Sequence, residues 1–415
     1  MDDTLAHAPA TTRHSDVNLL YAARCIRGLG DGFAVVILPA YLTAIGLTPA
    51  QIGFIAAASL FGTAVFTLLV GLIAPRYTLR HLLALGAALM AATGAALPSC
   101  DYVLWIAAVL FIGTINPSTG DIGVLVPLEH ASLARGVADR ERTRTFARYS
   151  LTGALSMAAG SLMAGLSDAL VRFGVTHLTA LRLMFYLYAA LGIVAVLFYL
   201  RLPRAHAQPS RPAAPLGPSR SVVYRLAALF SLDAFAGGFV VQSLLALWLF
   251  EKFELSIAAA SVFFFWAGVL AAFSHPVAAW IASRVGLVNT MVFTHIPSSI
   301  CLIAAALSSD MTLALGLLLT RSALSQMDVP TRTSYVMAVV TPAERTAAAS
   351  VTAVPRSLAS SISPAFAGIL LTLPFAGLPL ILCGSLKIIY DLVLLYSFRH
   401  IKPPEEKAGP GVSAS

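Results

Sequence analysis

Three charged residues share one face of the first long apolar segment. Arg24, Arg27 and Asp31 follow one another at spacings of four or fewer residues, which places them on the same side of a helix. A charge in the middle of a membrane is costly unless it is paired or hydrated, so we expect this face to line a water-filled path. Asp31 is the first candidate for carrying a proton, with Arg27 holding it ionised while the two are adjacent. The alternative is a permanent Arg27–Asp31 pair that only permits a buried charge.

A second proton-coupling candidate, Asp233, lies in the seventh apolar segment, roughly two hundred residues after Arg27. The repeat described below gives these two residues matched positions, so we expect them to meet across a central cavity. Side chains that suit a small organic ligand lie on the same and neighbouring segments. The candidates for lining this cavity are Arg24, Arg27, Tyr41, Asn116, Gln242, Trp248, Arg321 and Arg356.

Other polar residues in apolar segments have simpler interpretations. Lys387 and Asp391 are spaced i,i+4 in the last segment and are expected to neutralise each other in a structural pair. His275 and His295 are the histidines to consider as proton carriers, although an isolated helical histidine is more often a hydrogen-bonded packing residue. No segment carries the spacing of a metal site, and we expect neither a metal nor a cofactor.

The elements that position these residues are long apolar segments. Hydrophobic residues make up 58% of the 415 residues and charged residues 11%, which leaves too little polar surface for a soluble globule. Apolar runs of about 20 residues without strand alternation cross a membrane as helices. The sequence therefore predicts an all-α membrane protein with twelve transmembrane helices at 19–45, 51–73, 80–98, 102–124, 146–170, 180–200, 222–249, 257–281, 287–307, 311–329, 347–372 and 378–398.

The last six segments repeat the first six. Gly32-Phe33 recurs as Gly238-Phe239, and Glu141-Arg142-Thr143 recurs as Glu344-Arg345-Thr346. Such a repeat is typical of transporters built from two homologous halves. We expect the chain to divide into an N-terminal half (1–200), a cytoplasmic linker rich in Pro, Ala and Arg (201–221), a C-terminal half (222–402) and a disordered tail (403–415).

The distribution of Lys and Arg predicts the orientation. Most of these residues lie at the termini and in the segments 74–80, 125–148, 201–225, 282–286 and 330–346. The positive-inside rule therefore places both termini in the cytoplasm of a multi-pass protein, and we expect a plasma membrane of the bacterial inner-membrane type. Basic residues are not clustered on a soluble face, so nucleic acid is not an expected partner.

Two loops carry a family signature. The segments Gly71-Leu-Ile-Ala-Pro-Arg-Tyr-Thr-Leu-Arg80 and Ala279-Trp-Ile-Ala-Ser-Arg-Val-Gly-Leu-Val288 resemble the Gly-x-Leu-Ala-Asp-Arg-x-Gly-Arg-Arg loop of the major facilitator superfamily. The family's Asp is replaced by Pro75 and Ser283. Degenerate versions of the glycine motifs of drug and proton antiporters follow, with Gly153, Gly160 and Gly165 in the fifth helix and Ser363-Pro364 with Gly368 in the eleventh.

The resemblance implies a two-half fold that rocks around a central site, and the missing signature Asp leaves its gate to other acids. Asp121 and Asp328 stand at repeat-related positions near the expected cytoplasmic ends of their helices. The gate candidates are therefore Arg76 or Arg80 with Asp121, and Arg284 with Asp328. The alternative is a set of static pairs that hold helix ends.

These features favour a secondary active transporter that works by alternating access, with protons or another ion as the energy source. A nucleotide-binding loop is not found, and neither a metalloprotease motif nor a nucleophile elbow indicates an enzyme. We expect proton-coupled efflux of a small organic compound by a monomer in the lipid bilayer. One alternative is uptake or exchange of an organic anion, favoured by the surplus of buried arginine. Another is a membrane receptor or scaffold without transport.

Overall fold

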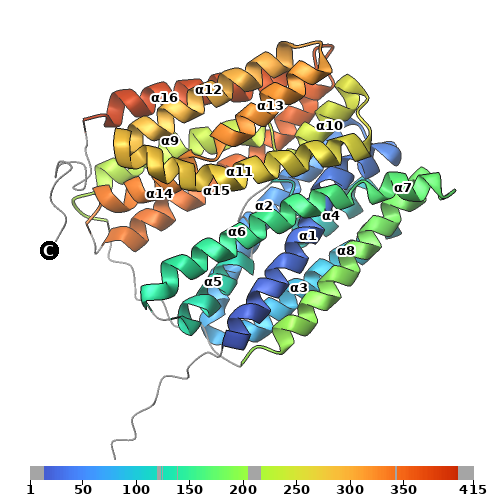
Figure 1. The fold of residues 1–415 in the computed structure, drawn as a ribbon, viewed down its shortest axis with the longest axis horizontal. Coiled ribbons are helices and arrows are strands. Elements are labelled where there is room, and N and C mark those ends of the chain that lie inside the picture. Colours follow the sequence, from blue (N-terminus) through green and yellow to red (C-terminus); the bar gives the residue numbers. More distant parts are fainter. Residues whose placement is uncertain are drawn as a thin grey trace, which may run out of the picture.

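The protein is described from a computed structural model. The residues that the structure describes are 14–118, 123, 125–137, 139–203, 216–341 and 344–400, and within them the regular elements are helices. Figure 1 shows two bundles side by side, one built from the first half of the chain and one from the second. Most of the expected linker and the whole of the expected tail lie outside the described residues.

Among the described residues, the N-terminal half contains eight α-helices and two short 3-10 turns, Ala74–Arg76 after α2 and Leu97–Ser99 after α3. The α-helices are α1 (His14–Ala44), α2 (Pro49–Ile73), α3 (Leu79–Ala96), α4 (Val103–Ile112), α5 (Leu125–Gly136), α6 (Asp139–Met163), α7 (Leu166–Arg172) and α8 (His177–Leu200).

The C-terminal half contains the remaining eight α-helices of the described residues. They are α9 (Arg220–Gly238), α10 (Gln242–Phe253), α11 (Ile257–Val285), α12 (Leu287–Leu307), α13 (Met311–Ser325), α14 (Asp328–Val339), α15 (Arg345–Leu371) and α16 (Leu378–Phe398).

Local sequence explains where several helices begin. Thr48 caps α2 in a reciprocal capping box with Gln51, and Pro49 occupies the first helical position, where its missing N–H is not needed. The side chains of Ser256 and Asp310 accept backbone N–H groups at the starts of α11 and α13.

Four of the expected helices are broken, and one of them, 146–170, is divided into α6 and α7. The expected helix 102–124 is wrong in its second part, because α4 ends at Ile112 and a separate helix, α5, occupies residues expected to be a loop. The expected helix 222–249 is divided into α9 and α10, and the expected helix 311–329 into α13 and α14, which runs on into the expected loop 330–346. Irregular backbone at membrane depth is tolerated where it lies inside the protein or lines a cavity.

Nine helical stretches among the described residues are long and apolar enough to cross a membrane. Three expected helices are not among them. The expected helix 102–124 corresponds to α4 with α5, 311–329 corresponds to α13 with α14, and 347–372 corresponds to α15. Many large apolar side chains, such as Leu72, Phe173 and Tyr396, remain exposed on the outer surface of the bundle. An exposed apolar surface of this kind matches a lipid environment.

Glycine allows close helix packing within each half. A Cβ atom on Gly32 of α1 would lie 2.0 Å from the carbonyl oxygen of Met157 in α6. In the second half, a Cβ atom on Gly238 of α9 would lie 2.0 Å from Oγ of Ser363 in α15. Two members of the antiporter-like motifs lie at such contacts, because a Cβ atom on Gly160 of α6 would lie 2.2 Å from the carbonyl oxygen of Leu29 in α1, and Ser363 forms the contact with Gly238.

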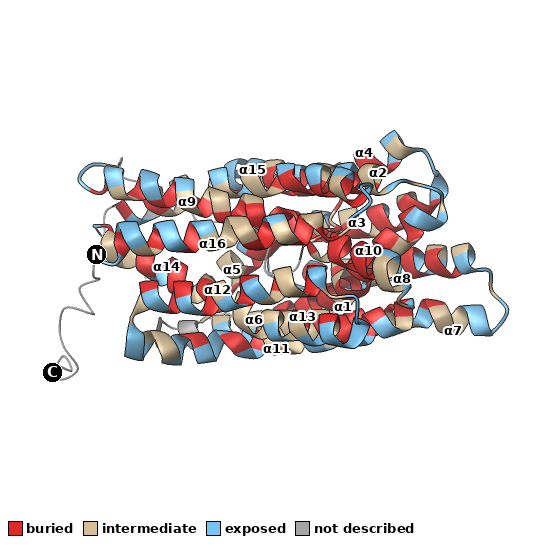
Figure 2. Ribbon diagram, turned by 90° about the horizontal axis from the view of Figure 1, so that it is seen from above, coloured by how far each residue is buried: buried red, intermediate tan, exposed pale blue. Residues whose placement is uncertain are grey.

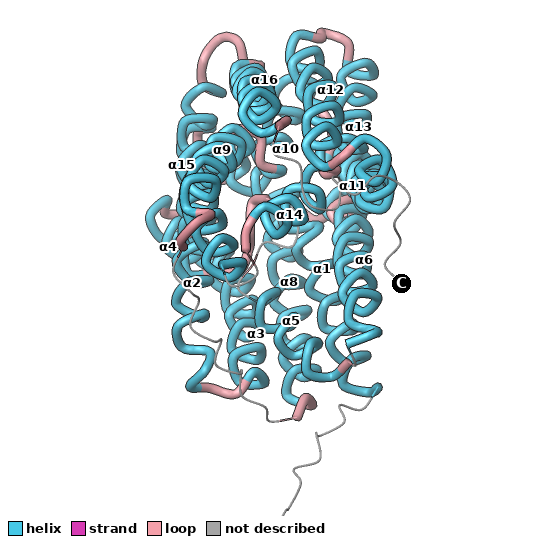
Figure 3. The backbone as a smooth tube through the Cα atoms, turned by 90° about the vertical axis from the view of Figure 1, so that its left-hand side faces the viewer, coloured by secondary structure: helices cyan, strands magenta, loops and turns pink. Residues whose placement is uncertain are grey.

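The two halves join at one face and separate at the other. One hydrophobic core draws residues from both halves, including Phe33 and Tyr41 of α1 and Leu244 and Trp248 of α10. Two further cores each belong to one half only and lie toward the face where α1 begins and α16 ends, which we call the terminal face. Figure 2 shows burial along the bundle, and Figure 3 shows the two groups of helices from the terminal face.

A direct bond between the halves lies at the opposite face. The carboxylate of Asp168 in α7 accepts the backbone N–H of Ala258, in the first turn of α11, at 2.8 Å. Backbone atoms of α2 and α15 also approach there, since a Cβ atom on Gly368 would lie 2.5 Å from the carbonyl oxygen of Pro49. The structure is therefore closed at the opposite face.

At the terminal face, Glu344 ties the start of the second half to α15. Its carboxylate accepts hydrogen bonds from Oγ1 of Thr341 at 2.6 Å, from Oγ of Ser219 at 2.7 Å and from the backbone N–H of Gly217. These three bonds favour the ionised form and lower the pKa of Glu344 from 4.5 to about 2.

Candidate functional site

A cavity of about 80 Å³, which we call the polar cavity for the polar side chains in its otherwise apolar lining, lies in the N-terminal half. It is formed by α1, α2, α3 and α6 and by the irregular segment between α4 and α5. Its polar lining includes Arg24, Arg27, Asp31, Thr114 and Asn116. The structure thus brings together the three charged residues of α1 and one further cavity candidate, Asn116, in a cavity whose lining residues all belong to the first half.

Asp31 carries no ion pair with any described residue. Its Oδ1 accepts a hydrogen bond from the hydroxyl group of Tyr188 in α8 at 3.0 Å, and that hydroxyl lies 3.1 Å from Oγ1 of Thr114. The permanent Arg27–Asp31 pair considered above is absent, because Arg27 is engaged elsewhere. Asp31 is therefore an acid that faces a cavity and is held by the hydroxyl group of Tyr188.

Arg27 pairs with Glu129 of α5 instead. Its Nη1 lies 2.7 Å from Oε2 of Glu129, which is fully buried and also accepts hydrogen bonds from the hydroxyls of Tyr149 and Tyr199. Arg24 lies over the ring of Tyr149, 5.2 Å from its centroid. The sequence analysis missed Glu129 because it placed residues 125–148 in a loop.

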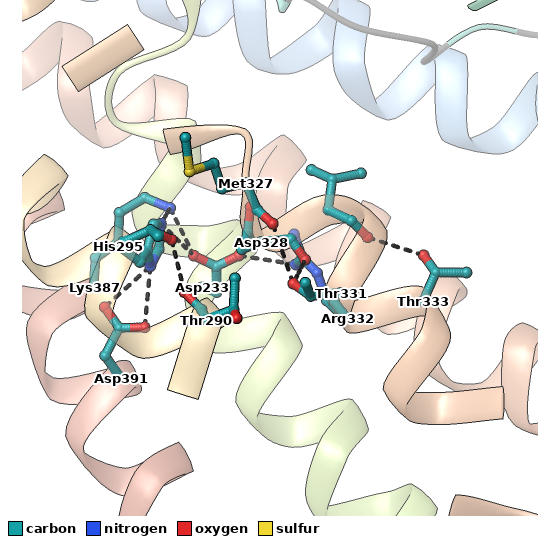
Figure 4. Close-up of polar contacts among 12 residues, drawn as sticks. Asp233, Thr290, His295, Met327, Asp328, Thr331, Arg332, Thr333, Lys387 and Asp391 are labelled. Carbon is teal, nitrogen blue, oxygen red and sulfur yellow. Dashed lines mark hydrogen bonds and ion pairs between the residues drawn. The ribbon is translucent and has the colours of Figure 1, made fainter. Parts of the chain in front are cut away.

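The expected meeting of Arg27 and Asp233 is wrong in this structure. Asp233 of α9 accepts Nζ of Lys387 at 2.6 Å and Nη1 of Arg332 at 3.0 Å, both from its own half (Figure 4). Nη2 of Arg332 also lies 2.5 Å from Asp328. Two cations thus contact Asp233, whereas Asp31 has none in direct contact.

His295 of α12 joins Lys387 to Asp391, which replaces the expected Lys387–Asp391 pair. Its Nδ1 lies 3.0 Å from Oδ2 of Asp391, and its Nε2 lies 3.2 Å from Nζ of Lys387. His295 is buried and hydrogen-bonded, in agreement with the interpretation as a hydrogen-bonded packing residue, but it is not isolated from other polar residues. Figure 4 shows the three side chains converging with Asp233 from α9, α12 and α16.

The two halves use the same type of ion pair with the charges reversed. In the first half, the cation is on α1 and the acid on α5 (Arg27–Glu129), whereas in the second half the acid is on α9 and the cation on α14 (Asp233–Arg332). Both α5 and α14 are the second parts of broken helices. Each pair therefore fixes a broken helix to the first long helix of its half.

The breaks in two helices meet between the halves. The backbone N–H of Ser243, at the start of α10, donates to the carbonyl oxygen of Pro117 in the irregular segment after α4 at 3.1 Å. Two buried polar atoms belong to the residues next to this bond: Nδ2 of Asn116 and Oε1 of Gln242, neither of which has a hydrogen-bond partner among the described residues. An unpaired donor and an unpaired acceptor suit a polar ligand.

Tyr41 and Trp248 lie away from the polar cavity, in the shared hydrophobic core. The hydroxyl of Tyr41 contacts Asp101 at 3.1 Å, and the ring of Trp248 packs against Phe253 and lies under Nζ of Lys252. Both side chains are fully buried. The structure thus gives them packing contacts where the sequence analysis expected cavity lining.

Arg321 of α13 and Arg356 of α15 remain the cationic candidates of the second half. Both are partly buried, and neither forms an ion pair with a described residue. Arg356 lies within electrostatic range of Arg332, Asp233 and Asp328.

The expected gate pairs are not formed by the described residues. Asp328 is the first residue of α14 and lies beside a helix break, and it pairs with Arg332 in place of Arg284. Arg284 is exposed and lies over the ring of Trp280, 4.1 Å from its centroid. Arg76 is exposed and Arg80 partly buried, and their expected partner Asp121 lies outside the described residues.

No group of three or more His, Cys, Asp or Glu residues within the described ranges has the geometry of a metal site. The described residues therefore offer buried ion pairs in both halves and a cavity with polar side chains in the first half. A family model described as Major Facilitator Superfamily matches residues 20–364. The chain belongs to the major facilitator superfamily.

Known proteins resemble this major facilitator chain along nearly its whole length. The uncharacterized membrane protein YJR124C of Saccharomyces cerevisiae is 25% identical over 421 residues, which cover 92% of this chain and 94% of that protein. The crystal structure of the nucleoside transporter NupG matches with a TM-score of 0.72 and 14% identity, covering 92% of this chain and 99% of that chain. An inward open structure of the xylose transporter XylE from E. coli matches with a TM-score of 0.72 and 14% identity, covering 92% and 96%.

A human organic anion transporter, MFSD10, has the same fold, with a TM-score of 0.62, 16% identity and coverage of 92% of this chain and 99% of that chain. Membership of the family identifies the protein as a multi-pass membrane protein and a secondary transporter for small molecules. The solved structures share the fold with this chain, and their substrates differ from one another.

Proposed function

We propose that this transporter couples proton movement to the export of a small organic compound by alternating access, with Asp31 as the residue that carries the proton. The observation behind this proposal is the contrast between Asp31 and the other carboxylates buried in the helices. Glu129, Asp233, Asp328 and Asp391 each lie within 4 Å of an Arg, Lys or His side chain, whereas Asp31 contacts only a tyrosine hydroxyl.

A carboxylate without a paired cation binds a proton without breaking an ion pair. Asp31 also lines the polar cavity, so that water and substrate have access to it. Its hydrogen bond to Tyr188 links it to Thr114, at the helix break where the expected substrate contacts begin. A proton on Asp31 therefore changes the charge of the cavity beside the ligand groups.

Asn116 and Gln242 are the substrate contacts that we propose. Their unpaired amide atoms lie next to the hydrogen bond that joins the two halves, Ser243 to Pro117. Discontinuous helices of this kind form the substrate sites of many transporters near the middle of the membrane. A ligand that bridges the two amides contacts both halves and senses their relative movement.

The test is proton movement in proteoliposomes with a pH-sensitive dye inside. Purified parent protein, Asp31→Asn and the matched control Asp310→Asn are each challenged with a mixed panel of cationic, neutral and anionic compounds. Asp310 caps α13 through its side chain oxygen, and Asn caps equally well at an exposed site. We expect compound-triggered proton flux in the parent and the control, and its loss in Asp31→Asn.

The outcomes separate the possible explanations. Equal flux in Asp31→Asn and the parent would reject Asp31 as the proton carrier. Silence from folded parent protein over the whole panel would reject proton coupling and favour a receptor or scaffold. Tyr188→Phe adds a graded test, since it removes only the hydroxyl that holds Asp31 and is expected to shift the pH dependence of flux while flux itself continues.

The second candidate function, exchange or uptake of an organic anion, is supported by Arg321 and Arg356. Neither has an ion-pair partner among the described residues, although both lie in helices of the membrane-embedded bundle. One structural neighbour, MFSD10, is described as an organic anion transporter. In the same assay, Arg321→Gln is expected to abolish responses to anions, while Arg284→Gln, at an exposed arginine, leaves them intact.

A further inference from the structure

A buried cluster in the second half connects a histidine to a lysine and two acids. It consists of Asp233 of α9, His295 of α12, and Lys387 and Asp391 of α16, and we call it the His295 cluster (Figure 4). Nζ of Lys387 lies 2.6 Å from Oδ1 of Asp233 and 3.2 Å from Nε2 of His295. Nδ1 of His295 lies 3.0 Å from Asp391.

The contacts of His295 define its protonation state. A lysine ammonium group has only donors, so Nε2 of His295 accepts from Lys387 and carries no proton. The single ring proton is then on Nδ1, where it is donated to Asp391. His295 is therefore neutral in this arrangement. It accepts a hydrogen bond from a cation on one side and donates one to a carboxylate on the other, which we call the relay.

A second proton on His295 is incompatible with this arrangement. The second proton would be placed on Nε2, only 3.2 Å from Nζ of Lys387. The ammonium group of Lys387 is itself a cation and a donor, so it would repel this proton. Oδ1 of Asp233 lies 3.9 Å from the same nitrogen, so the imidazolium has an acceptor within reach once Lys387 moves away. Proton binding therefore replaces the ammonium group of Lys387 at Asp233 by the imidazolium group of His295.

The other charged groups around His295 do not block the replacement of Lys387 by His295 at Asp233. From α14, Arg332 occupies Oδ2 of Asp233 and Asp328 pairs with Arg332, while Tyr390 of α16 meets the imidazole ring edge-on. On α11, the charged side chains His275 and Arg284 are exposed.

The charged side chain of α13 is Arg321. Cys383 of α16 lies within electrostatic range of both Arg321 and Lys387. After leaving Asp233, the ammonium group of Lys387 would then lie near a second cation, Arg321.

Lys387 has room to move. Gly237 of α9 lies beside it, since a Cβ atom there would be 3.8 Å from Nζ, and the lysine side chain keeps 13% of its surface accessible. Cys383 precedes Lys387 by four residues and so shares its face of α16, and Arg321, which has no ion pair with a described residue, is an electrostatic neighbour of Cys383.

We propose that proton binding to His295 releases Lys387 from Asp233 and that Lys387, together with Arg321, then binds an organic anion. The inference rests on the second candidate function proposed above, exchange or uptake of an organic anion, and adds Lys387 to the groups that bind the anion. It makes anion binding and proton uptake favour each other at one site, because each requires Lys387 to leave Asp233. The site is distinct from the polar cavity around Asp31.

The test is ligand binding by the purified full chain in detergent, measured as thermal stabilisation at graded ligand concentrations. The probe is benzenesulfonate, whose charge is the same at pH 5.5 and pH 8, and the neutral control is methyl phenyl sulfone. We expect benzenesulfonate to bind about 5- to 150-fold more tightly at pH 5.5 than at pH 8, the usual range for coupled sites. The sulfone is expected to show no such difference.

Variants assign the effect to the cluster. His295→Gln preserves an acceptor for Lys387 and a donor for Asp391 but takes up no proton, so binding is expected to be weak at both pH values. Arg321→Gln removes one of the two proposed anion contacts and is expected to weaken binding at pH 5.5. His275→Gln, at the exposed histidine of α11, is the matched control and is expected to behave like the parent.

Three results would overturn the proposal: no benzenesulfonate binding by the parent, equal affinity at the two pH values, or a retained pH difference in His295→Gln. If a variant fails to fold, nitrogen NMR of histidine-labelled parent gives an independent answer. The Nδ1–H form of His295 is expected at pH 8, and the Nε2–H form would refute the relay. Because binding is measured without flux, failure here leaves the role of Asp31 intact, and failure of Asp31-dependent flux leaves this binding intact.

Discussion

Removing the charge of Glu129 tests whether the buried pair with Arg27 holds the first half together. The perturbation is Glu129→Gln, which keeps the shape of the side chain. Glu129 has no exposed surface and accepts bonds from Arg27 at 2.7 Å and from Tyr199 at 2.5 Å, in addition to Tyr149. Breaking one partner of a buried pair typically costs about 3–5 kcal/mol, because the other charge is left uncompensated.

That loss is large enough to measure in detergent by thermal unfolding followed through tryptophan fluorescence. For a cooperative unit of roughly 200 residues, 1 kcal/mol corresponds to about 2–4 °C, so the midpoint should fall by about 6–20 °C. The double variant Arg27→Gln with Glu129→Gln has no buried charge to strand and should recover at least half of the loss. Additive losses in the double variant, or an unchanged midpoint in Glu129→Gln, would refute the reasoning.

Three further predictions follow from contacts outside the cavity. Because the pKa of Glu344 is lowered to about 2, its ionised form stabilises the fold fully above pH 4.5 and progressively less as pH falls toward 2, so parent protein should lose more stability than Glu344→Gln between pH 5 and 2.5 in acid-melting experiments. Gly32→Ala would place a Cβ 2.0 Å from a carbonyl oxygen of α6 and should cost about 1–3 kcal/mol by thermal unfolding, whereas Gly71→Ala, with open space around it, should be neutral within about 0.5 kcal/mol. Asp168→Ala removes the acceptor for the N–H of Ala258 between the halves and should increase thiol labelling of cysteines placed at the opposite face, while Asp168→Asn, which keeps an acceptor, should label like the parent.

Much of the fold followed from the spacing of apolar segments and from the repeat, and the helix breaks did not. Residues 125–148 contain Glu129, His130 and several arginines, and this polarity resembles that of a loop. The helix α5 is possible there because Arg27 and two tyrosines satisfy Glu129, and these partners are distant in the sequence. Average hydropathy does not show which distant residues pair with a charged side chain.

The candidate site was predicted in part. The repeat correctly gave Arg27 and Asp233 equivalent places, but a pattern in one dimension did not show that each pairs within its own half. A signal was present, since the offset that relates Glu141 to Glu344 also relates Glu129 to Arg332, which are opposite in charge like Arg27 and Asp233. Asp31 was identified because an acid deep in an apolar segment is unusual, whereas its partner Tyr188 lies among ordinary aromatic residues.

The reversed ion pairs have a consequence for biogenesis. Every ion pair between described residues joins side chains of one half, so the charges of Arg27 and Asp233 are each compensated without the other half. During cotranslational insertion, the first bundle can therefore bury its charges before the second has left the ribosome. Two separately synthesised polypeptides, 1–203 and 216–415, should consequently insert independently and assemble afterwards through the shared hydrophobic core.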